Sequence, residues 1–99
     1  MAEFLDVDPG NLRLPPSRFS GADPGKLARH ISQFGSSMQG MPVLEVTRGA
    51  NGDLMINSGV TRPIRIAKLL PGQTVRVEVI DTQPNRDMTK YPRVKDRLP

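Results

Sequence analysis

Cysteine is absent from this chain of 99 residues. Disulfides, thiolate metal sites and thiol-based catalysis are therefore excluded. Zinc binding is disfavoured as well, because His30 is the single histidine. The chain also lacks a run of about 18 apolar residues that could span a bilayer, and residues 1–6 include two acids, Glu3 and Asp6, where a signal peptide has a basic start. These absences predict a cytoplasmic protein with no membrane partner.

Aromatic residues are few, with three Phe, one Tyr and no Trp, so the core must consist mainly of Val, Ile, Leu and Met. A chain of this length suits one compact domain. The net charge of +4 favours polyanionic partners such as nucleic acids or nucleotides. Much of the surplus, however, lies near the C-terminus, at Lys90, Arg93, Lys95 and Arg97. Total charge alone therefore does not locate a binding surface.

The hydrophobic pattern predicts an α/β (α+β) domain with a mixed sheet. Asp23-Pro24 is a typical helix start, Gly35 a typical helix end, and Asn51-Gly52 a strong hairpin signal. We expect the domain over residues 1–81, followed by a basic, flexible tail over 82–99. The predicted order is strand 4–8, helix 24–34, strand 43–47, strand 54–57, helix 61–70 and strand 74–80.

The turn that opens the second predicted helix is the best candidate for a binding site. A helix N-terminus presents unpaired backbone N–H groups and a partial positive charge, which suits an anion. Gly59 permits close approach or a positive φ, while Ser58 and Thr61 add hydroxyl groups. Arg62 and Arg65 can grip phosphate. The alternative is that the hydroxyls cap the helix and both arginines are solvated.

The same segments, in their order and spacing, carry a resemblance to a known family. The arrangement resembles the ParB/sulfiredoxin fold superfamily, including ParB-like nuclease domains, in which a Gly-x-x-Arg turn follows a hairpin, opens a helix and contacts nucleotide phosphates. The resemblance implies that role for Gly59 and Arg62, with Arg65 assisting one turn beyond. The segments concerned are Met41-Pro42-Val43, residues 54–62, Ile66-Ala67-Lys68-Leu69 and Val75-Arg76-Val77-Glu78-Val79.

Departures from the family turn restrict the activity that the resemblance implies. Chromosome-partitioning members have Gly-Glu-Arg-Arg where this chain has Gly59-Val60-Thr61-Arg62, so the acid associated with nucleotide hydrolysis is missing and triphosphatase (CTPase) activity is disfavoured. Sulfiredoxins have a catalytic cysteine where this chain has Val60, which excludes sulfiredoxin activity. Phosphate binding remains the expected activity. ParB-like nuclease activity, supported by a divalent metal such as Mg²⁺, is left open.

Two further sets of residues have both a chemical and a structural interpretation. His30 is a weak candidate for a catalytic general base, or else a solvated or locally bonded histidine. A pair of acids could hold metal if they converged, but turn and strand-end roles are the simpler interpretation, so no metal ligand is assigned. The acids concerned are Asp6, Asp8, Asp53 and Asp81.

The remaining candidates concern macromolecular partners. Met38 and Met41 could form an adaptable protein-binding surface or pack onto the core. Tyr91, among the basic residues near the C-terminus, could stack on a nucleic acid. The sequence thus predicts a domain that binds nucleotide or nucleic acid phosphates; the alternative is a non-catalytic protein-interaction module that kept the fold and lost the chemistry.

Overall fold

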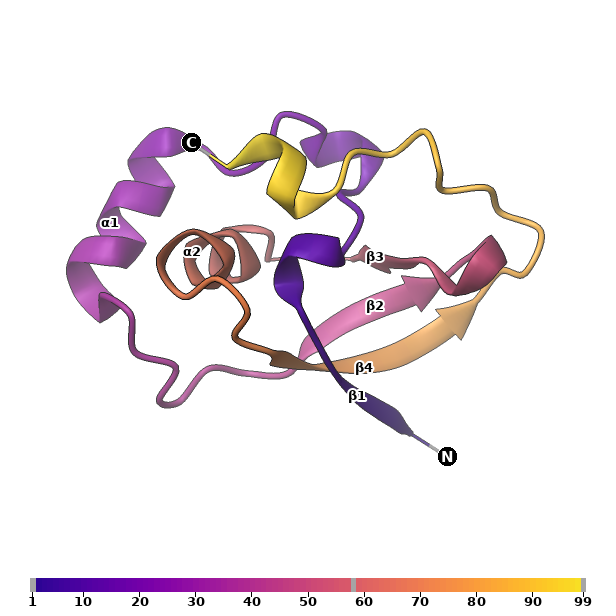
Figure 1. Ribbon diagram of the computed structural model, residues 1–99, viewed down its shortest axis with the longest axis horizontal. Helices are drawn as coiled ribbons and strands as arrows, with labels where there is room; N and C mark the ends of the chain where they lie inside the picture. The colour runs from indigo at the N-terminus through magenta and orange to yellow at the C-terminus, as the bar shows by residue number, and fades with distance from the viewer. Residues whose placement is uncertain (1, 58, 99) are drawn as a thin grey trace.

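The computed structural model describes residues 2–57 and 59–98. Over these ranges it contains one four-stranded mixed sheet and two α-helices (Figure 1). The strands are β1 (Glu3–Val7), β2 (Leu44–Arg48), β3 (Leu54–Ile56) and β4 (Val75–Thr82), and the helices are α1 (Pro24–Phe34) and α2 (Thr61–Leu69). Short 3₁₀ turns lie at Pro9–Asn11, Pro16–Arg18, Ala50–Gly52 and Val94–Arg97. The predicted fold class and the order β-α-β-β-α-β are confirmed.

The strands lie in the order β1-β4-β2-β3 across the sheet. β4 pairs antiparallel with β1 and parallel with β2, while β2 and β3 form an antiparallel hairpin. The parallel pair requires a crossover, and α2, which connects β3 to β4, provides it. This connection places the N-terminus of α2 directly after β3, where the sequence predicted the phosphate-binding turn.

Local signals in the sequence explain the bounds of α1 and of the hairpin. The Asp23 carboxylate accepts a hydrogen bond of 3.0 Å from the Lys26 N–H at the start of α1. Gly35 ends the helix with a φ of 56°, a left-handed conformation that glycine adopts without strain. In the hairpin turn, Asn51 and Gly52 both have positive φ, as an Asn-Gly turn requires.

The core lies between the sheet and α2, and α1 packs on the far side of α2 (Figure 1). Ile64 and Ile66 of α2 and Val46 and Val77 of the sheet are completely buried. Leu27 is the buried residue of α1. α1 therefore packs against α2 at the side of the core.

Residues 83–98 differ from the flexible tail expected from the sequence, because they pack back onto the domain. Met88 and Val94 are both fully buried, and Val94 belongs to the main hydrophobic core. The Val94 N–H donates to the Leu12 carbonyl at 2.9 Å, which ties this segment to the N-terminal third of the chain. These two buried residues and the backbone hydrogen bonds anchor the segment, and the compact unit extends well beyond residue 81.

Candidate anion-binding site

The turn between β3 and α2 has the backbone geometry that its glycine predicts. Gly59 has a φ of 77°, which a residue with a Cβ rarely adopts. Val60 is the N-cap of α2 and makes no side-chain capping bond, and Thr61 is the first helical residue. Ser58, also predicted as a ligand, lies outside the described residues. At the described N-cap of α2, therefore, no side-chain oxygen caps the helix.

Arg62 lies in the first turn of α2, with its guanidinium above the glycine. A Cβ placed on Gly59 would meet the Arg62 Nη1 atom at 3.5 Å. No hydrogen bond or ion pair joins this guanidinium to any other described residue. The side chain is half-buried. Arg62 is thus held next to the N-terminus of α2 with its hydrogen-bonding capacity unused among the described residues.

Arg65 has a structural role that the sequence did not predict. It is only 3% exposed, and its Nη1 donates to the carbonyls of Gly35 and Ser37, each at 2.8 Å. Its guanidinium also lies 5.4 Å from the centre of the Phe34 ring. The side chain therefore fixes the C-terminal end of α1 against α2. The signal in the sequence was an arginine placed between two core residues, Ile64 and Ile66.

Arg62 and Arg65 both line a pocket of about 260 Å³ between α1 and the connection to β2. No acidic side chain contributes to its wall. Two nitrogen atoms near it, His30 Nδ1 and Arg65 Nε, are buried without a hydrogen-bond partner in the described structure. The lining residues are His30, Gln33, Phe34, Gln39, Gly40, Met41, Pro42, Arg62 and Arg65.

His30 lies in this pocket with the two arginines, although it is distant from them in the sequence. Burial lowers the pKa of its imidazole, and the charges of Arg62, Arg65 and Lys26 lower that pKa further. The imidazole is therefore neutral at pH 7, where it can accept or donate a proton. Its proposed role as a general base stays a prediction, but the structure brings it to the arginines.

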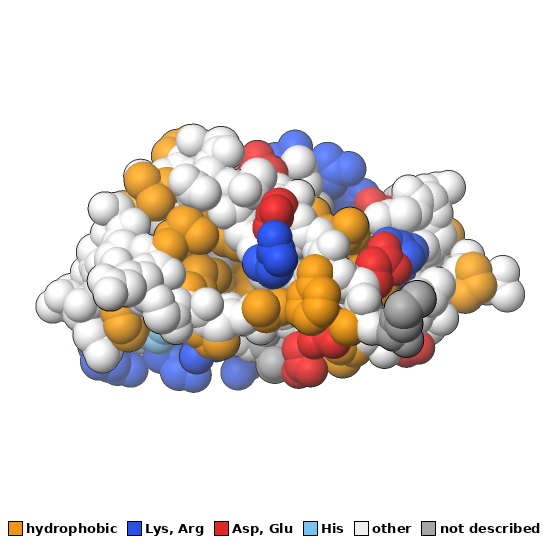
Figure 2. All heavy atoms as spheres, turned by 90° about the horizontal axis from the view of Figure 1, so that it is seen from below, with side chains coloured by type: hydrophobic (Ala, Val, Ile, Leu, Met, Phe, Trp, Pro, Cys, Tyr) orange, Lys and Arg blue, Asp and Glu red, His pale blue; other side chains and the backbone are white. Residues whose placement is uncertain are grey.

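Gly59 and Thr61 line a second, polar cleft of about 590 Å³ at the N-terminal ends of both helices. Lys26 of α1 and Arg18 contribute basic groups to this cleft, and the sequence gave no signal for either because tertiary packing brings them there. The predicted site thus spans two neighbouring hollows. Figure 2 shows the histidine in pale blue among Lys and Arg side chains along one edge of the molecule.

The four acids considered as metal ligands each have a hydrogen-bond or ion-pair partner within the domain. Asp6 pairs with Arg76 at 3.0 Å, and Asp53 pairs with Arg13 at 3.4 Å. In the described part of the chain, no three His, Cys, Asp or Glu side chains come together as metal ligands. The other two acids, Asp8 and Asp81, accept backbone N–H bonds from Gly10 and Thr82.

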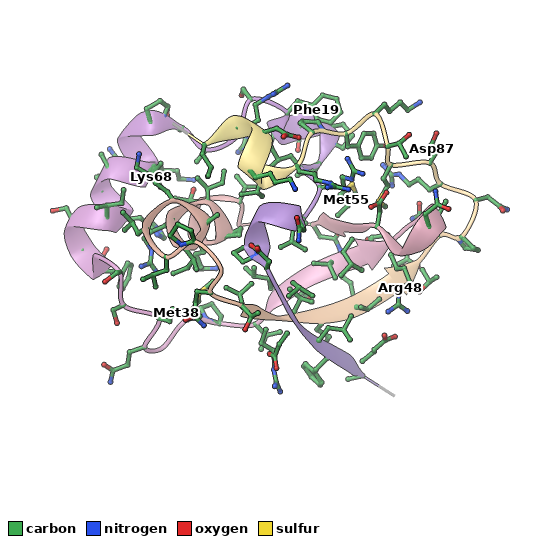
Figure 3. The ribbon with its side chains drawn as sticks, in the orientation of Figure 1. Phe19, Met38, Arg48, Met55, Lys68 and Asp87 are labelled. Carbon is green, nitrogen blue, oxygen red and sulfur yellow. The ribbon has the colours of Figure 1, made fainter. Side chains whose placement is uncertain are left out.

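The residues considered for partner binding are engaged within the domain. The Tyr91 hydroxyl accepts a hydrogen bond of 2.9 Å from Arg86, and its ring lies 5.4 Å from that of Phe19. Met38 and Met41 pack against the hydrophobic core, and Figure 3 shows Met38 in the connection that follows α1. The core-packing interpretation of the methionines is thus confirmed.

Comparisons with known proteins add no assignment to this geometry. No helix among the described residues has the length and apolar character needed to cross a membrane. No family model, curated protein or solved structure matches the chain. The resemblance to the ParB/sulfiredoxin fold superfamily stays a prediction from the sequence.

Proposed function

We propose that this domain binds the phosphate groups of nucleotides or nucleic acids in the groove between α1 and α2. The groove consists of the pocket around Arg62 and the adjacent cleft around Gly59 and Thr61. Its phosphate ligands are the guanidinium of Arg62 and the backbone N–H groups at the start of α2. Lys26 adds charge from α1, and Arg65 positions the helices.

The observation that supports the proposal is the convergence of cations without compensating acids. The pKa of His30 is lowered by the positive charges of Arg62, Arg65 and Lys26, and no carboxylate lines the pocket that contains this histidine. The neighbouring cleft does include an acid, Asp23, whose carboxylate accepts a hydrogen bond from the Lys26 N–H at the start of α1. Holding like charges together costs free energy unless an anion binds between them. A phosphate group supplies the missing charge and the acceptor oxygens.

The N-terminus of α2 adds directed hydrogen-bond donors to the groove as well as positive charge. Unpaired N–H groups and the helix dipole favour an anion at the start of α2. Pro63 lacks an N–H, so the donors available are those of the residues just before it. Because Arg62 lies over Gly59 at this point, one phosphate can contact both the guanidinium and the turn.

The test is calorimetric titration of the protein with CTP, ATP and a short single-stranded DNA, comparing Arg62→Ala with Arg76→Ala. Both variants lose one positive charge, but Arg76 is an exposed residue on the sheet that already pairs with Asp6. Charge-assisted hydrogen bonds contribute about 1.5–3 kcal/mol, so we expect Arg62→Ala to weaken binding about tenfold or more. Arg76→Ala should bind like the wild type.

Equal affinities for the two variants, or no binding of any ligand, would contradict the proposal. The protein-interaction module without phosphate chemistry would then be the better account.

Nuclease-type cleavage is a second proposal, and the position of His30 favours it. A neutral imidazole beside two arginines can accept a proton while the cations stabilise charge on a phosphodiester. The test is degradation of labelled RNA and DNA by the wild type and by His30→Ala. Cleavage that His30→Ala abolishes while phosphate binding persists would support it, and cleavage at the wild-type rate by the variant would contradict it.

A further inference from the structure

The pocket beside Arg62 has features that phosphate binding does not require. Its wall contains the Phe34 ring, and Met41 and Pro42 add apolar surface. Phe34 is 39% exposed, and its ring has the Arg65 guanidinium beside it. Two amide side chains, Gln33 and Gln39, complete the polar part of the wall. A ligand that uses all of these groups needs a flat apolar face and hydrogen-bonding edges.

A nucleobase has this combination of properties. We infer that the pocket takes the unpaired base of a single-stranded nucleic acid, whose phosphate lies at Gly59 and Arg62. The base stacks on Phe34, and the amides of Gln33 and Gln39 face its edge. This inference rests on the proposed phosphate site and names the class of ligand that the site takes.

The size and position of the hollows favour a strand over a duplex. A pocket of about 260 Å³ is smaller than the usual pockets for drug-sized ligands, so it suits a single base that has left its stack. A base that stays paired inside a duplex cannot enter such a pocket. Stacking on an exposed aromatic next to a basic groove is how single strands are generally bound.

The two hollows also follow one another along α1. Lys26 lines the polar cleft and His30 and Phe34 line the pocket, so the groove extends roughly 12 Å along this helix. Arg62 lies between its two parts, because the neighbouring residue Thr61 faces the cleft while Arg62 faces the pocket. A strand can therefore place a base in the pocket and continue its backbone past the basic groups of the cleft.

The Phe34 ring is suited to be the platform on which a base stacks. The Arg65 guanidinium lies 5.4 Å from the ring centre, and the His30 ring lies 5.5 Å from it. Arg65 is itself fixed by two carbonyls at the end of α1. The ring is thus held in place before a ligand arrives, which reduces the entropy lost on binding.

The experiment measures fluorescence anisotropy of labelled oligothymidine and oligouridine, of a DNA duplex of equal length, and competition by free TMP. The variants are Phe34→Leu, which keeps apolar packing but removes the ring, and Phe34→Tyr, which keeps the ring. Phe4→Ala is the control, because Phe4 is also an exposed aromatic, 48% exposed, but belongs to β1. Circular dichroism verifies that each variant is folded.

We expect Phe34→Leu to weaken binding of both single strands about fivefold or more, while Phe34→Tyr and Phe4→Ala bind like the wild type. Duplex binding should be weaker than single-strand binding and unaffected by Phe34→Leu. The difference in affinity between the two single-stranded probes shows whether the site prefers DNA or RNA.

Failure of this inference can be told from failure of the proposed function. If Arg62→Ala weakens binding but Phe34→Leu does not, the phosphate site stands and the base pocket is overturned. If free TMP binds as tightly as the oligomers, the ligand is a free nucleotide and the assignment to strands is overturned. If Arg62→Ala changes nothing, the proposed function fails first.

Discussion

Arginines on the sheet and arginines in the helical groove have different surroundings. Those of the sheet side have carboxylates as partners, and red and blue side chains lie next to each other over the sheet in Figure 2. Arg48, for example, lies at the end of the sheet away from α1 (Figure 3). In the groove, the charges of Arg62, Arg65 and Lys26 act on a histidine instead. The sheet-side pairs are Arg76 with Asp6, Arg48 with Glu3 and Arg13 with Asp53.

The pKa directions express the same difference. On the sheet, the hydrogen bond from Arg76 lowers the pKa of the Asp6 carboxyl, so each charge stabilises the other. In the groove, burial and then the charges of Arg62, Arg65 and Lys26 lower the pKa of His30, so protonation is opposed. Compensated charges contribute to solubility and modestly to stability, whereas uncompensated charges make a surface selective for anions.

The largest expected effect concerns stability and Arg65. Arg65→Met removes the donors to the Gly35 and Ser37 carbonyls and should lower the free energy of unfolding by about 2 kcal/mol, since hydrogen bonds to a charged group contribute about 1.5–3 kcal/mol. Urea denaturation measures the effect. Arg76→Met, on the exposed sheet face, should have little effect. Equal stability of the two variants would mean that Arg65 does not clamp α1.

A smaller effect is expected at the turn. Gly59→Ala places a Cβ on a residue with a φ of 77°, which costs about 1–2 kcal/mol, and brings the Cβ near Arg62. Gly72→Ala is the matched control, because its φ is 86° and its Cβ would meet nothing. Both variants should lose similar stability in thermal unfolding, but calorimetry with ATP should show weaker binding for Gly59→Ala alone. Wild-type affinity in Gly59→Ala would show that the turn is not part of the binding site.

The smallest expected effect is a change in the titration of His30. NMR should give this imidazole a pKa below its ordinary 6.5. Arg62→Ala removes one of the causes and should raise that pKa, while Arg76→Ala should leave it unchanged. Because the unfolded chain binds this proton more readily, His30 lowers stability as the pH falls through about 6.5. An unchanged pKa in Arg62→Ala would show that the two side chains do not interact.

Elements with local signals were predictable from the sequence. The bounds of α1 follow from Asp23 and Gly35, and the hairpin follows from Asn51-Gly52. The positive φ of Gly59 follows from the need for a tight turn into α2.

Features that depend on distant contacts were not predictable. Val94 packs on the core although its neighbours are polar, so composition alone suggested a flexible segment. Arg65 was expected to assist phosphate binding, but its donors to the end of α1 appear only when the helices are packed. The approach of His30 to Arg62, and of Lys26 to the cleft beside Thr61, has the same origin.

The most direct test of the account is an NMR shift map of the ¹⁵N-labelled protein titrated with ATP. The account predicts saturable shifts at Gly59, Thr61, Arg62 and His30, with the backbone signals around Arg76 unchanged. Shifts confined to the sheet side, or no saturable shift at the start of α2, would contradict the claim that uncompensated charge between α1 and α2 forms a phosphate-binding site.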